Sequence, residues 1–592
     1  MVSREEINQL VGDADRAVKM DGRAQTIVED TLREFKEMQL MRNTTATQWE
    51  EVAEILSPND KNTFFFGNFN WPGEKKTQRQ IDSNGQQALE KFKAICDSLL
   101  TPRNMFWHGL ESDIPEVQKD RKARLWYEQA THALFKLRYA ANANFGSQNQ
   151  MVFHSLGAYG TAGMYLDEFF APYGSERGFR YRGMPMGELF IKENHQGLVD
   201  GFVRWFRLNG RQAKLAYPEA WDAGLLKRCE TAFAAKSEEK FDFLHHVCLR
   251  SDYEPDRRDA KGKKFASFHI SFNDQTLIRE GGYNTFPLPV SRYIQAPGET
   301  YGRGPAMMVL PSLKTLNAEK ATFLKQGHRA ADPILLITDD GLWDNNMRPG
   351  SRVVGGMSAD GKPLVGVLPT GEIQISKEMM AEEKALILDA FLVTLFQIMT
   401  ETPQMTATEV IERTNEKGIL LAPTVGRQQS EYLGVLIPRE IDLAMRLRLL
   451  PPMPGIIRES GAGYNIAYTS PISRAMKAQE AAGFMRTVES VKELVNITGD
   501  ASLLDSFNFD VAVPAISRIQ AVPESWMATK QEIQQKRQNR AKAQQTQQQI
   551  QALPAQAAML KAQAVVKKNE PGIEQGGMGG PQPGPPGQQQ AA

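Results

Sequence analysis

The sequence predicts an α+β protein that is predominantly helical, and two of its features lead to this class. Apolar residues recur every three or four positions over long charged segments, as on the buried face of a helix. Two other stretches, 160–209 and 240–300, hold aromatic and β-branched runs separated by glycine-containing turns, which is typical of strands. With 592 residues, 41% of them hydrophobic, the chain can build several cores, and we expect two to four domains.

The first 160 residues are expected to be mainly helical. Helical spacing begins near residue 23, and Pro58 ends this first segment. An aromatic-rich loop follows, and Pro102 stops the next helix. The helices expected in this part cover residues 23–57, 83–101, 118–147 and a further segment ending near Leu156.

The middle of the chain alternates between the two patterns. Helices are expected at 210–237 and 305–331, on either side of the strand-like stretch 240–300. Glycine-rich strands are expected between 334 and 375. The later helices are expected at 377–400, at 406–417, from Pro438 onward, and from Pro471 onward with Ser470 as the N-cap.

The composition changes near Pro523. Residues 530–568 contain 12 glutamines and carry a net charge of +7, with few apolar residues. Alanine and glutamine favour a helix there. Beyond Pro571 the chain is low-complexity, and we expect it to be disordered.

Charge, cysteine content and hydropathy exclude several classes of protein. Lys+Arg and Asp+Glu both number 70, and this balance argues against tight, non-specific wrapping of DNA. The three cysteines, Cys96, Cys229 and Cys248, are too few for a disulfide framework and fit a reducing cytoplasm. The apolar stretch Ala385–Met399 is too short to span a bilayer and contains Asp389. With no apolar core of a signal peptide at the N-terminus, we expect a soluble protein made inside a cell.

Two motifs raise the question of catalysis or metal binding. "GMSADGKP", Gly356–Pro363, fits part of a phosphate-binding loop, but Pro363 stands where a Ser or Thr would hold Mg²⁺, and a hairpin turn is the favoured interpretation. His245, His246 and Cys248, with His269 nearby, lack the ligand spacing of a zinc site. We therefore expect no catalytic residues, no cofactor, no metal and no enzymatic activity.

A flexible corner precedes the helix expected at 305–331. "YGRGP", Tyr301–Pro305, has the glycines of a phosphate-cradling loop but not its Lys or its Ser/Thr. Pro305 suits the first turn of a helix, which favours a corner with an architectural role. The apolar residues of the helix are interleaved with Lys314, Lys320 and Lys325, so we expect neighbours on more than one side and hence assembly.

Several segments together resemble the head-to-tail connector, or portal, proteins of short-tailed double-stranded DNA bacteriophages. "YGRGPAMMVLPSLKTLNAEKATFLKQGHRAADPILL" resembles the signature segment of that family. "WEEVAEILSPND", "DSNGQQALEKFKAICDSLLTPRNMFWHGL" and "LGAYGTAGMYLDEFF" are similar to its N-terminal region, and "MTATEVIERTNEKGILLAPTVGRQQSEYLGVLIPREIDLAM" and "YTSPISRAMKAQE" to its later part. They cover most of residues 40–500 in family order, and the glutamine-rich tail lies outside the resemblance.

The resemblance implies a portal-type subunit in a ring, typically of twelve copies, at one capsid vertex. Double-stranded DNA would pass through the channel of the ring during packaging and ejection. Terminase and then tail adaptor proteins would dock on the ring, and major capsid and scaffolding proteins would surround it. It would be assembled in the host cytoplasm, belong to the virion and have no membrane partner.

The resemblance also implies wing, stem, clip and crown regions. Tyr301–Pro305 would be the clip-to-stem corner, and Lys314, Lys320 and Lys325 would be candidates for facing the channel. The channel loop would be formed by Thr400, Glu401, Thr402, Pro403, Gln404 and Met405, and an ordinary helix–helix turn in the wing is the alternative for this segment. The expected divisions are an N-terminal wing region at 1–209, a first stem helix at 210–239, a β-rich clip at 240–303, a second stem helix at 304–331, wing strands with a long helix and the channel loop at 332–405, a wing/crown helical region at 406–522, a glutamine-rich helical tail or barrel at 523–570, and a disordered tail at 571–592.

Two alternative functions remain open at this stage. One is a nucleotide-driven subunit of the DNA-packaging motor, which needs an intact phosphate-binding loop. The other is a scaffold protein without a DNA channel, which the diameter of a central hole would separate from a portal.

Overall fold

Helix α1 (Arg4–Leu56) opens the chain and contacts strands of the β-rich centre of the protein. This computed structural model divides into two compact units, Met1–Val522 and Pro523–Ala592. The described residues are 4–65, 73–170, 177–217, 223–235, 239–337, 357–363, 365–368, 373–394, 423–469, 471–499, 505–519, 522, 526–528, 531–547 and 559.

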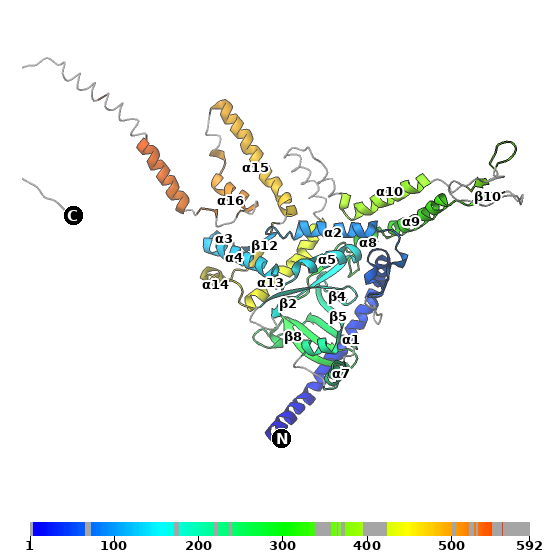
Figure 1. Ribbon diagram of the computed structural model, residues 1–592. Coiled ribbons are helices and arrows are strands. Elements are labelled where there is room, and N and C mark those ends of the chain that lie inside the picture. The colour runs from blue at the N-terminus through cyan, green and yellow to red at the C-terminus, as the bar shows by residue number, and fades with distance from the viewer. Residues whose placement is uncertain are drawn as a thin grey trace, which may run out of the picture. The chain divides into compact units, whose positions relative to one another are not determined.

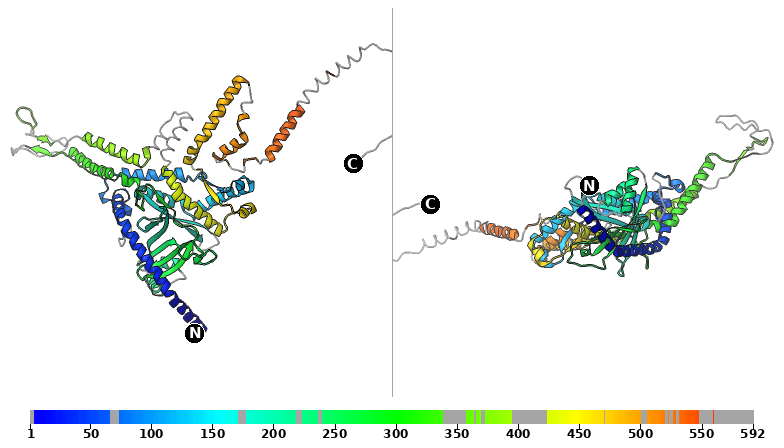
Figure 2. Two further views of the ribbon diagram at one scale, coloured as in Figure 1. Left: turned by 180° about the vertical axis from the view of Figure 1, so that it is seen from behind. Right: turned by 90° about the horizontal axis from the view of Figure 1, so that it is seen from below.

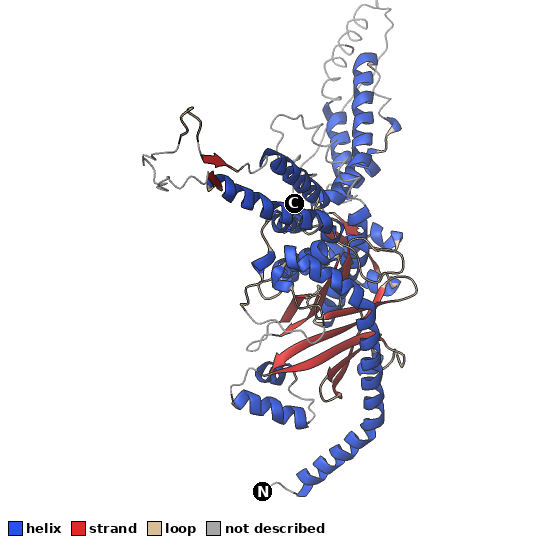
Figure 3. Ribbon diagram, turned by 90° about the vertical axis from the view of Figure 1, so that its right-hand side faces the viewer, coloured by secondary structure: helices blue, strands red, loops and turns tan. Residues whose placement is uncertain are grey.

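Strands of the first unit form two larger antiparallel sheets (Figures 1 and 3). One has five strands in the order β4-β5-β6-β7-β8, and the other has three in the order β3-β2-β9; β1 pairs with β12, and β10 with β11. The strands are β1 (His108–Ser112), β2 (Thr161–Phe170), β3 (Arg177–Met184), β4 (Leu189–Glu193), β5 (Val199–Asn209), β6 (Lys240–Leu249), β7 (Phe265–Ser271), β8 (Thr276–Tyr283), β9 (Val290–Arg292), β10 (Leu335–Ile337), β11 (Val365–Val367) and β12 (Tyr464–Tyr468).

Helices hold more of the described residues than strands do, so the expected α+β class with a helical majority is confirmed. Helix α1, drawn in dark blue, runs beside the strands in the two further views (Figure 2). The other helices are α2 (Asn84–Leu100), α3 (Pro115–Lys119), α4 (Arg121–Arg138), α5 (Phe145–Tyr159), α6 (Gly210–Ala216), α7 (Ala223–Ala234), α8 (Pro305–Met308), α9 (Leu310–Ala331), α10 (Ile373–Ala390), α13 (Gly434–Arg446) after a π-helical turn (Gln428–Leu433), α14 (Gly455–Ser460), α15 (Pro471–Thr498), α16 (Phe509–Ile519) and a helix over 531–547 in the second unit.

The segment 210–239 is not the single helix that was expected. It contains two short helices, α6 and α7, and Tyr217 leaves the helical conformation with φ −131°. Tyr217 precedes Pro218, and a proline disfavours the helical conformation of the residue before it. The two helices pack on the five-stranded sheet, where Ala213 and Cys229 share a buried cluster with Phe243.

The expected boundaries at residues 209 and 240 fall at the ends of two strands, β5 and β6, that pair with each other. Strand β5 pairs with β6 along its length, from Phe202↔Val247 to Asn209↔Lys240. One sheet therefore joins the segment expected to be the wing with the segment expected to be the clip.

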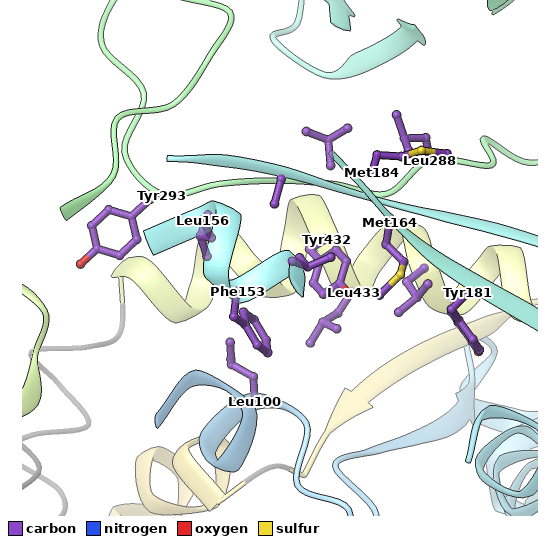
Figure 4. Close-up of a cluster of buried hydrophobic side chains, with 14 of the residues drawn as sticks. Leu100, Phe153, Leu156, Met164, Tyr181, Met184, Leu288, Tyr293, Tyr432 and Leu433 are labelled. Carbon is purple, nitrogen blue, oxygen red and sulfur yellow. The ribbon is translucent and has the colours of Figure 1, made fainter. Parts of the chain in front are cut away.

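One buried cluster holds most of the apolar side chains of the first unit. In Figure 4, Phe153 and Leu156 of α5 lie close to Tyr432 and Leu433, while Met164 of β2 lies near Tyr181. Residues more than 250 positions apart in the sequence thus share one core. This core fixes the π-helical turn against α5, and α13 against the three-stranded sheet.

A buried ion pair crosses this core. Arg138 of α4 donates from Nε to Glu440 of α13 over 2.9 Å, and both side chains are fully buried. Tyr181 donates to the same carboxylate over 2.5 Å. Burial alone would lower the pKa of Arg138, but the charge of Glu440 outweighs it and raises that pKa. The guanidinium therefore stays charged in the core, and Glu440 is its counter-ion.

Helix α1 is held on the five-stranded sheet by an ion pair of its own. Glu34 lies 3.3 Å from His246 of β6, and Thr31 bonds the other ring nitrogen over 3.0 Å. Burial would lower the pKa of His246, but its contacts with Cys248 and Glu34 raise it to about 9. The hydrogen bond to His246 lowers the pKa of Glu34 to about 2. The pair is thus charged at neutral pH.

Replacing Glu440 should strongly destabilise the first unit. Glu440→Gln leaves Arg138 buried without a counter-charge, which costs on the order of 3–5 kcal/mol. Urea unfolding followed by tryptophan fluorescence measures this loss. Glu116→Gln, an exposed change on α3, is the control and should unfold like the wild type. Equal midpoints for the two variants would contradict the role given to the pair.

The stability of the first unit should depend on pH through His246. The folded-state pKa of His246 is raised from 6.5 to about 9, so its contribution is full below pH 6.5 and is lost as pH rises through about 9. The pKa of Glu34 is lowered from 4.5 to about 2, so its contribution is full above pH 4.5 and is lost as pH falls through about 2. Together they stabilise α1 most between pH 4.5 and 6.5.

The melting temperature of the wild type should therefore fall more steeply between pH 6.5 and 9 than that of His246→Gln. His195→Gln, at an exposed histidine, should keep the wild-type profile. A His246→Gln profile parallel to that of the wild type would show that the pair does not titrate as described.

Candidate functional site

The corner Tyr301–Pro305 is where the β-rich part of the chain passes into α9, and it is built around a crossing of two backbones. Gly160 ends α5 with φ +72°. A Cβ atom at Gly160 would lie 2.3 Å from the amide nitrogen of Gly304 and 2.5 Å from the carbonyl oxygen of Gly302. A Cβ atom at Gly302 would likewise lie 2.4 Å from the oxygen of Gly160. Glycine is therefore required on both sides of the crossing.

Tyr301 anchors the corner in the core. Its ring meets Trp49 of α1 edge-to-face at 5.2 Å, and its hydroxyl accepts a hydrogen bond of 3.1 Å from the amide of Ile191. Trp49 donates from its indole to the carbonyl of Tyr159 over 2.9 Å, next to the crossing. Burial raises the pKa of Tyr301, so the hydroxyl stays protonated. The corner is thus fixed to α1, β4 and α5 together.

Backbone hydrogen bonds hold the crossing closed. Gly302 donates to the hydroxyl of Thr161 over 2.8 Å, and Tyr293 donates to the carbonyl of Gly160 over 2.9 Å. Arg303 donates to the carbonyl of Ile294 over 2.6 Å, so the chain before and after the corner forms a short bridge. These polar groups of the corner are occupied by the protein itself, which does not suit a phosphate-cradling loop.

Arg292 joins the corner to the later part of the chain. Its buried guanidinium donates to Glu193 over 2.8 Å, to Glu431 over 3.0 Å and to the carbonyl of Thr300 over 3.2 Å. Two carboxylates thus share one cation directly beside the corner. The contact with Glu431 reaches the π-helical turn before α13.

Helix α9 leaves the corner and is seated on the first hundred residues. Pro305 begins α8 at the first helical position, as the sequence predicts. Leu313 and Leu316 of α9 are buried. The side chain of Asn317 accepts hydrogen bonds from the amides of Ile81 and Asp82, at 2.8 and 3.1 Å. The direction of α9 is therefore set within its first two turns.

Beyond this seat, α9 and α10 form a two-helix hairpin with few other contacts. Figure 1 shows them side by side, with β10 at their far end. Ser376 donates to Gln326 over 3.2 Å between the helices, and Leu335↔Val367 begins the pairing of β10 with β11. The hairpin and its β-tip expose large apolar side chains, namely Leu324, Ile334, Leu336, Met357, Val367, Leu368, Met379 and Leu386.

The three lysines proposed from the sequence lie on α9 in different surroundings. Lys314 is ion-paired with Glu51 of α1, so it helps to seat the helix. Lys320 is half-buried, and Lys325 is exposed. The proposed channel loop, Thr400–Met405, lies outside the described residues.

The segment "ADGK" forms the hairpin turn that its sequence predicts. Gly361 has φ +77°, the amide of Ser358 donates to the carbonyl of Lys362 over 2.8 Å, and Met357 pairs with Pro363. A phosphate-binding loop instead opens a helix. Gly356 itself is outside the described part of the chain.

The histidines of β6 point to opposite sides of the sheet. His245 stacks on His269 with ring centroids 4.1 Å apart, while His246 faces α1. Burial lowers the pKa of His269 to about 3, and that of His245 well below its ordinary value. Within the described ranges, no three His, Cys, Asp or Glu side chains are grouped to hold a metal ion. A search of the same ranges finds no helix with the length and apolarity to cross a membrane.

The sequence predicts the corner Tyr301–Pro305 on one side of the crossing, but it does not predict Gly160 on the other side. Gly160 follows a helix and precedes a strand, a position that favours glycine, but its sequence does not say which backbone it meets. The sequence around Arg292 and Asn317 does not indicate which residues their side chains contact.

The chain is similar to known proteins over most of the first unit. Residues 29–527 match the model of a family described as bacteriophage head to tail connecting protein. The chain is 24% identical to a probable portal protein of Bordetella phage BPP-1, over 81% of this chain and 85% of that protein. It is 22% identical to a portal protein of Salmonella phage epsilon15, over 88% of this chain and 92% of that protein.

An alanine at Gly160 should prevent correct folding of the corner. Gly160→Ala combines an unfavourable positive φ with backbone contacts under 2.6 Å, which no side-chain movement relieves. Gly298→Ala is the matched control, because φ is +79° there and no atom lies within 4 Å. The control should lose only about 1–2 kcal/mol, measured by thermal unfolding, whereas Gly160→Ala should be recovered mainly as insoluble protein. Equal stability of the two would contradict the crossing.

Proposed function

Because the chain belongs to the bacteriophage head to tail connecting protein family, we propose that it is a portal subunit. In this role it forms the head-to-tail connector through which DNA is packaged into the capsid and later ejected. The observation that carries the proposal is the family match over residues 29–527, together with two portal proteins that each align with more than four fifths of this chain. The family description names a connecting part, and we propose no enzymatic activity for it.

We place the stem differently from the division that the sequence suggested. The helices of 210–239 are short and packed on the sheet, whereas α9 and α10 form an extended pair. We therefore propose α9 and α10 as the stem, and the segment between them, which includes β10 and β11, as the clip that meets terminase and then tail adaptor proteins. Tyr301–Pro305 remains the corner from which the stem begins.

Channel-facing residues follow from the same assignment. Lys314 is occupied by Glu51, so we retain Lys320 and Lys325 of α9 as the candidates for facing DNA. Thr400–Met405 follows α10 in the chain and remains our proposal for the channel loop. A ring of Glu401 side chains would repel phosphate and discourage DNA from adhering.

Ring formation gives a role to the exposed apolar side chains of the hairpin. A closed ring needs a head-to-tail interface with two different faces on each subunit. Leu324 of α9 and Leu386 of α10 are exposed at 44% and 52%, which suits burial against a neighbouring copy. We propose that about twelve copies close the ring at a capsid vertex of the virion, in contact with capsid and scaffolding proteins.

The purified protein should form closed rings with an axial hole wide enough for duplex DNA. Mass photometry gives the number of copies, and electron microscopy of the same sample shows the hole. We expect a single assembled species of about twelve subunits. A monodisperse monomer at micromolar concentration would contradict the proposal, and rings without a hole would favour the scaffold alternative.

The rings should not hydrolyse ATP. The "ADGK" turn lies between two paired residues, and Pro363 offers no hydroxyl for Mg²⁺. Phosphate release is measured from pure rings with and without DNA, and background turnover is expected in both. Turnover that is stimulated by DNA and disappears in Lys362→Ala would identify a packaging motor instead.

A further inference from the structure

The second unit contains a helix whose side chains are exposed on all sides. Every described residue from 531 to 547 is exposed, and the helix is drawn in orange-red in Figure 1. Among its 17 residues, Ile533 is the one large apolar side chain. A helix that is polar all round does not gain its stability from a buried face. Burial of an apolar face within the second unit therefore does not explain the composition of the helix over 531–547.

Positive charge is concentrated in this unit. The 70 residues from Pro523 to Ala592 contain eight Lys and Arg residues but four Asp and Glu residues, whereas the rest of the chain contains 62 and 66. The helix itself has one acidic residue, Glu532, and its four basic residues are Lys536, Arg537, Arg540 and Lys542. The cationic character is thus a property of this segment and not of the whole protein.

Three of these cations share one face of the helix. Lys536 and Arg540 are four residues apart, and Arg537 and Arg540 are three apart, so each pair lies on neighbouring turns. Like charges at these spacings destabilise an isolated helix by about 0.2–0.5 kcal/mol per pair. A polyanion that lies along the helix would remove this repulsion. The glutamines around the cations add neutral hydrogen-bond donors without adding negative charge.

We propose that the helix over 531–547 binds the phosphate backbone of duplex DNA without sequence preference. Lys and Arg contacts to phosphate act through charge and counter-ion release, and they need neither a groove nor a fixed register. The choice of DNA among polyanions rests on the proposed function, in which DNA enters and leaves through the assembled protein. We call this helix the cationic arm. The near-neutral first unit then leaves DNA free to slide, and the cationic arm retains the DNA.

The test measures DNA binding by the assembled full-length protein. The arm variant carries Lys536→Gln, Arg537→Gln, Arg540→Gln and Lys542→Gln. The matched control replaces four exposed lysines of the first unit: Lys36→Gln, Lys91→Gln, Lys119→Gln and Lys122→Gln. Fluorescence anisotropy with a labelled duplex of random sequence gives the affinity between about 50 and 200 mM salt. Mass photometry of each sample checks the assembly.

The arm variant should bind DNA more weakly at the lower salt concentration. Each lost phosphate contact should reduce the slope of log K against log salt by about 0.9, so the loss of four contacts reduces it by about 3.6. The control should keep the wild-type slope. An arm variant that binds like the control would overturn the inference, even where rings form normally and the proposed function stands.

A second polyanion separates DNA from an acidic protein partner. Poly-glutamate is added as an unlabelled competitor at the same concentration of negative charge as unlabelled duplex DNA. We expect duplex DNA to displace the labelled probe more effectively. Displacement by poly-glutamate that equals or exceeds that by DNA would overturn the assignment in favour of an acidic protein surface.

Discussion

The close passage of the chain at Gly160 past Gly302 and Gly304 is the constraint on which the rest of the first unit depends. There the end of α5 touches the backbone that leads into α9, with no room for a side chain between them. The crossing lies under Trp49 and beside Tyr301, so it also fixes α1 against the corner. The chain after Pro305 therefore starts from a position that α1, the end of α5 and the corner Tyr301–Pro305 fix together.

Buried charges connect this corner to parts that lie far away in the sequence. Arg292 joins the corner to the turn before α13, and α13 in turn holds Arg138 of α4 through Glu440. On the five-stranded sheet, His246 of β6 holds α1 through Glu34. Removing one member of such a pair leaves the other charge buried without its partner, which is strongly destabilising.

The sequence patterns predicted those structural features that depend on residues close to one another along the chain. The helical majority, the helix after Pro305, the turn at Gly361 and the alternation of His245 and His246 all follow from local chemistry. The pairing of β5 with β6 across thirty residues does not, because two short helices fill that interval without a signal of where the strand returns. For the candidate site, the sequence predicted a corner at Tyr301–Pro305 but not the backbone at Gly160 that it crosses. A glycine in the sequence does not indicate which other segment packs against it.

The most direct measurement of the central claim is an electron cryo-microscopy map of the assembled protein. We expect that α9 and α10 of each copy stand around the axial hole, that β10 and β11 lie at one end of it, and that the Gly160 crossing marks where the stem meets the body. A map in which α6 and α7 line the hole, with the α9–α10 hairpin on the outer rim, would contradict it.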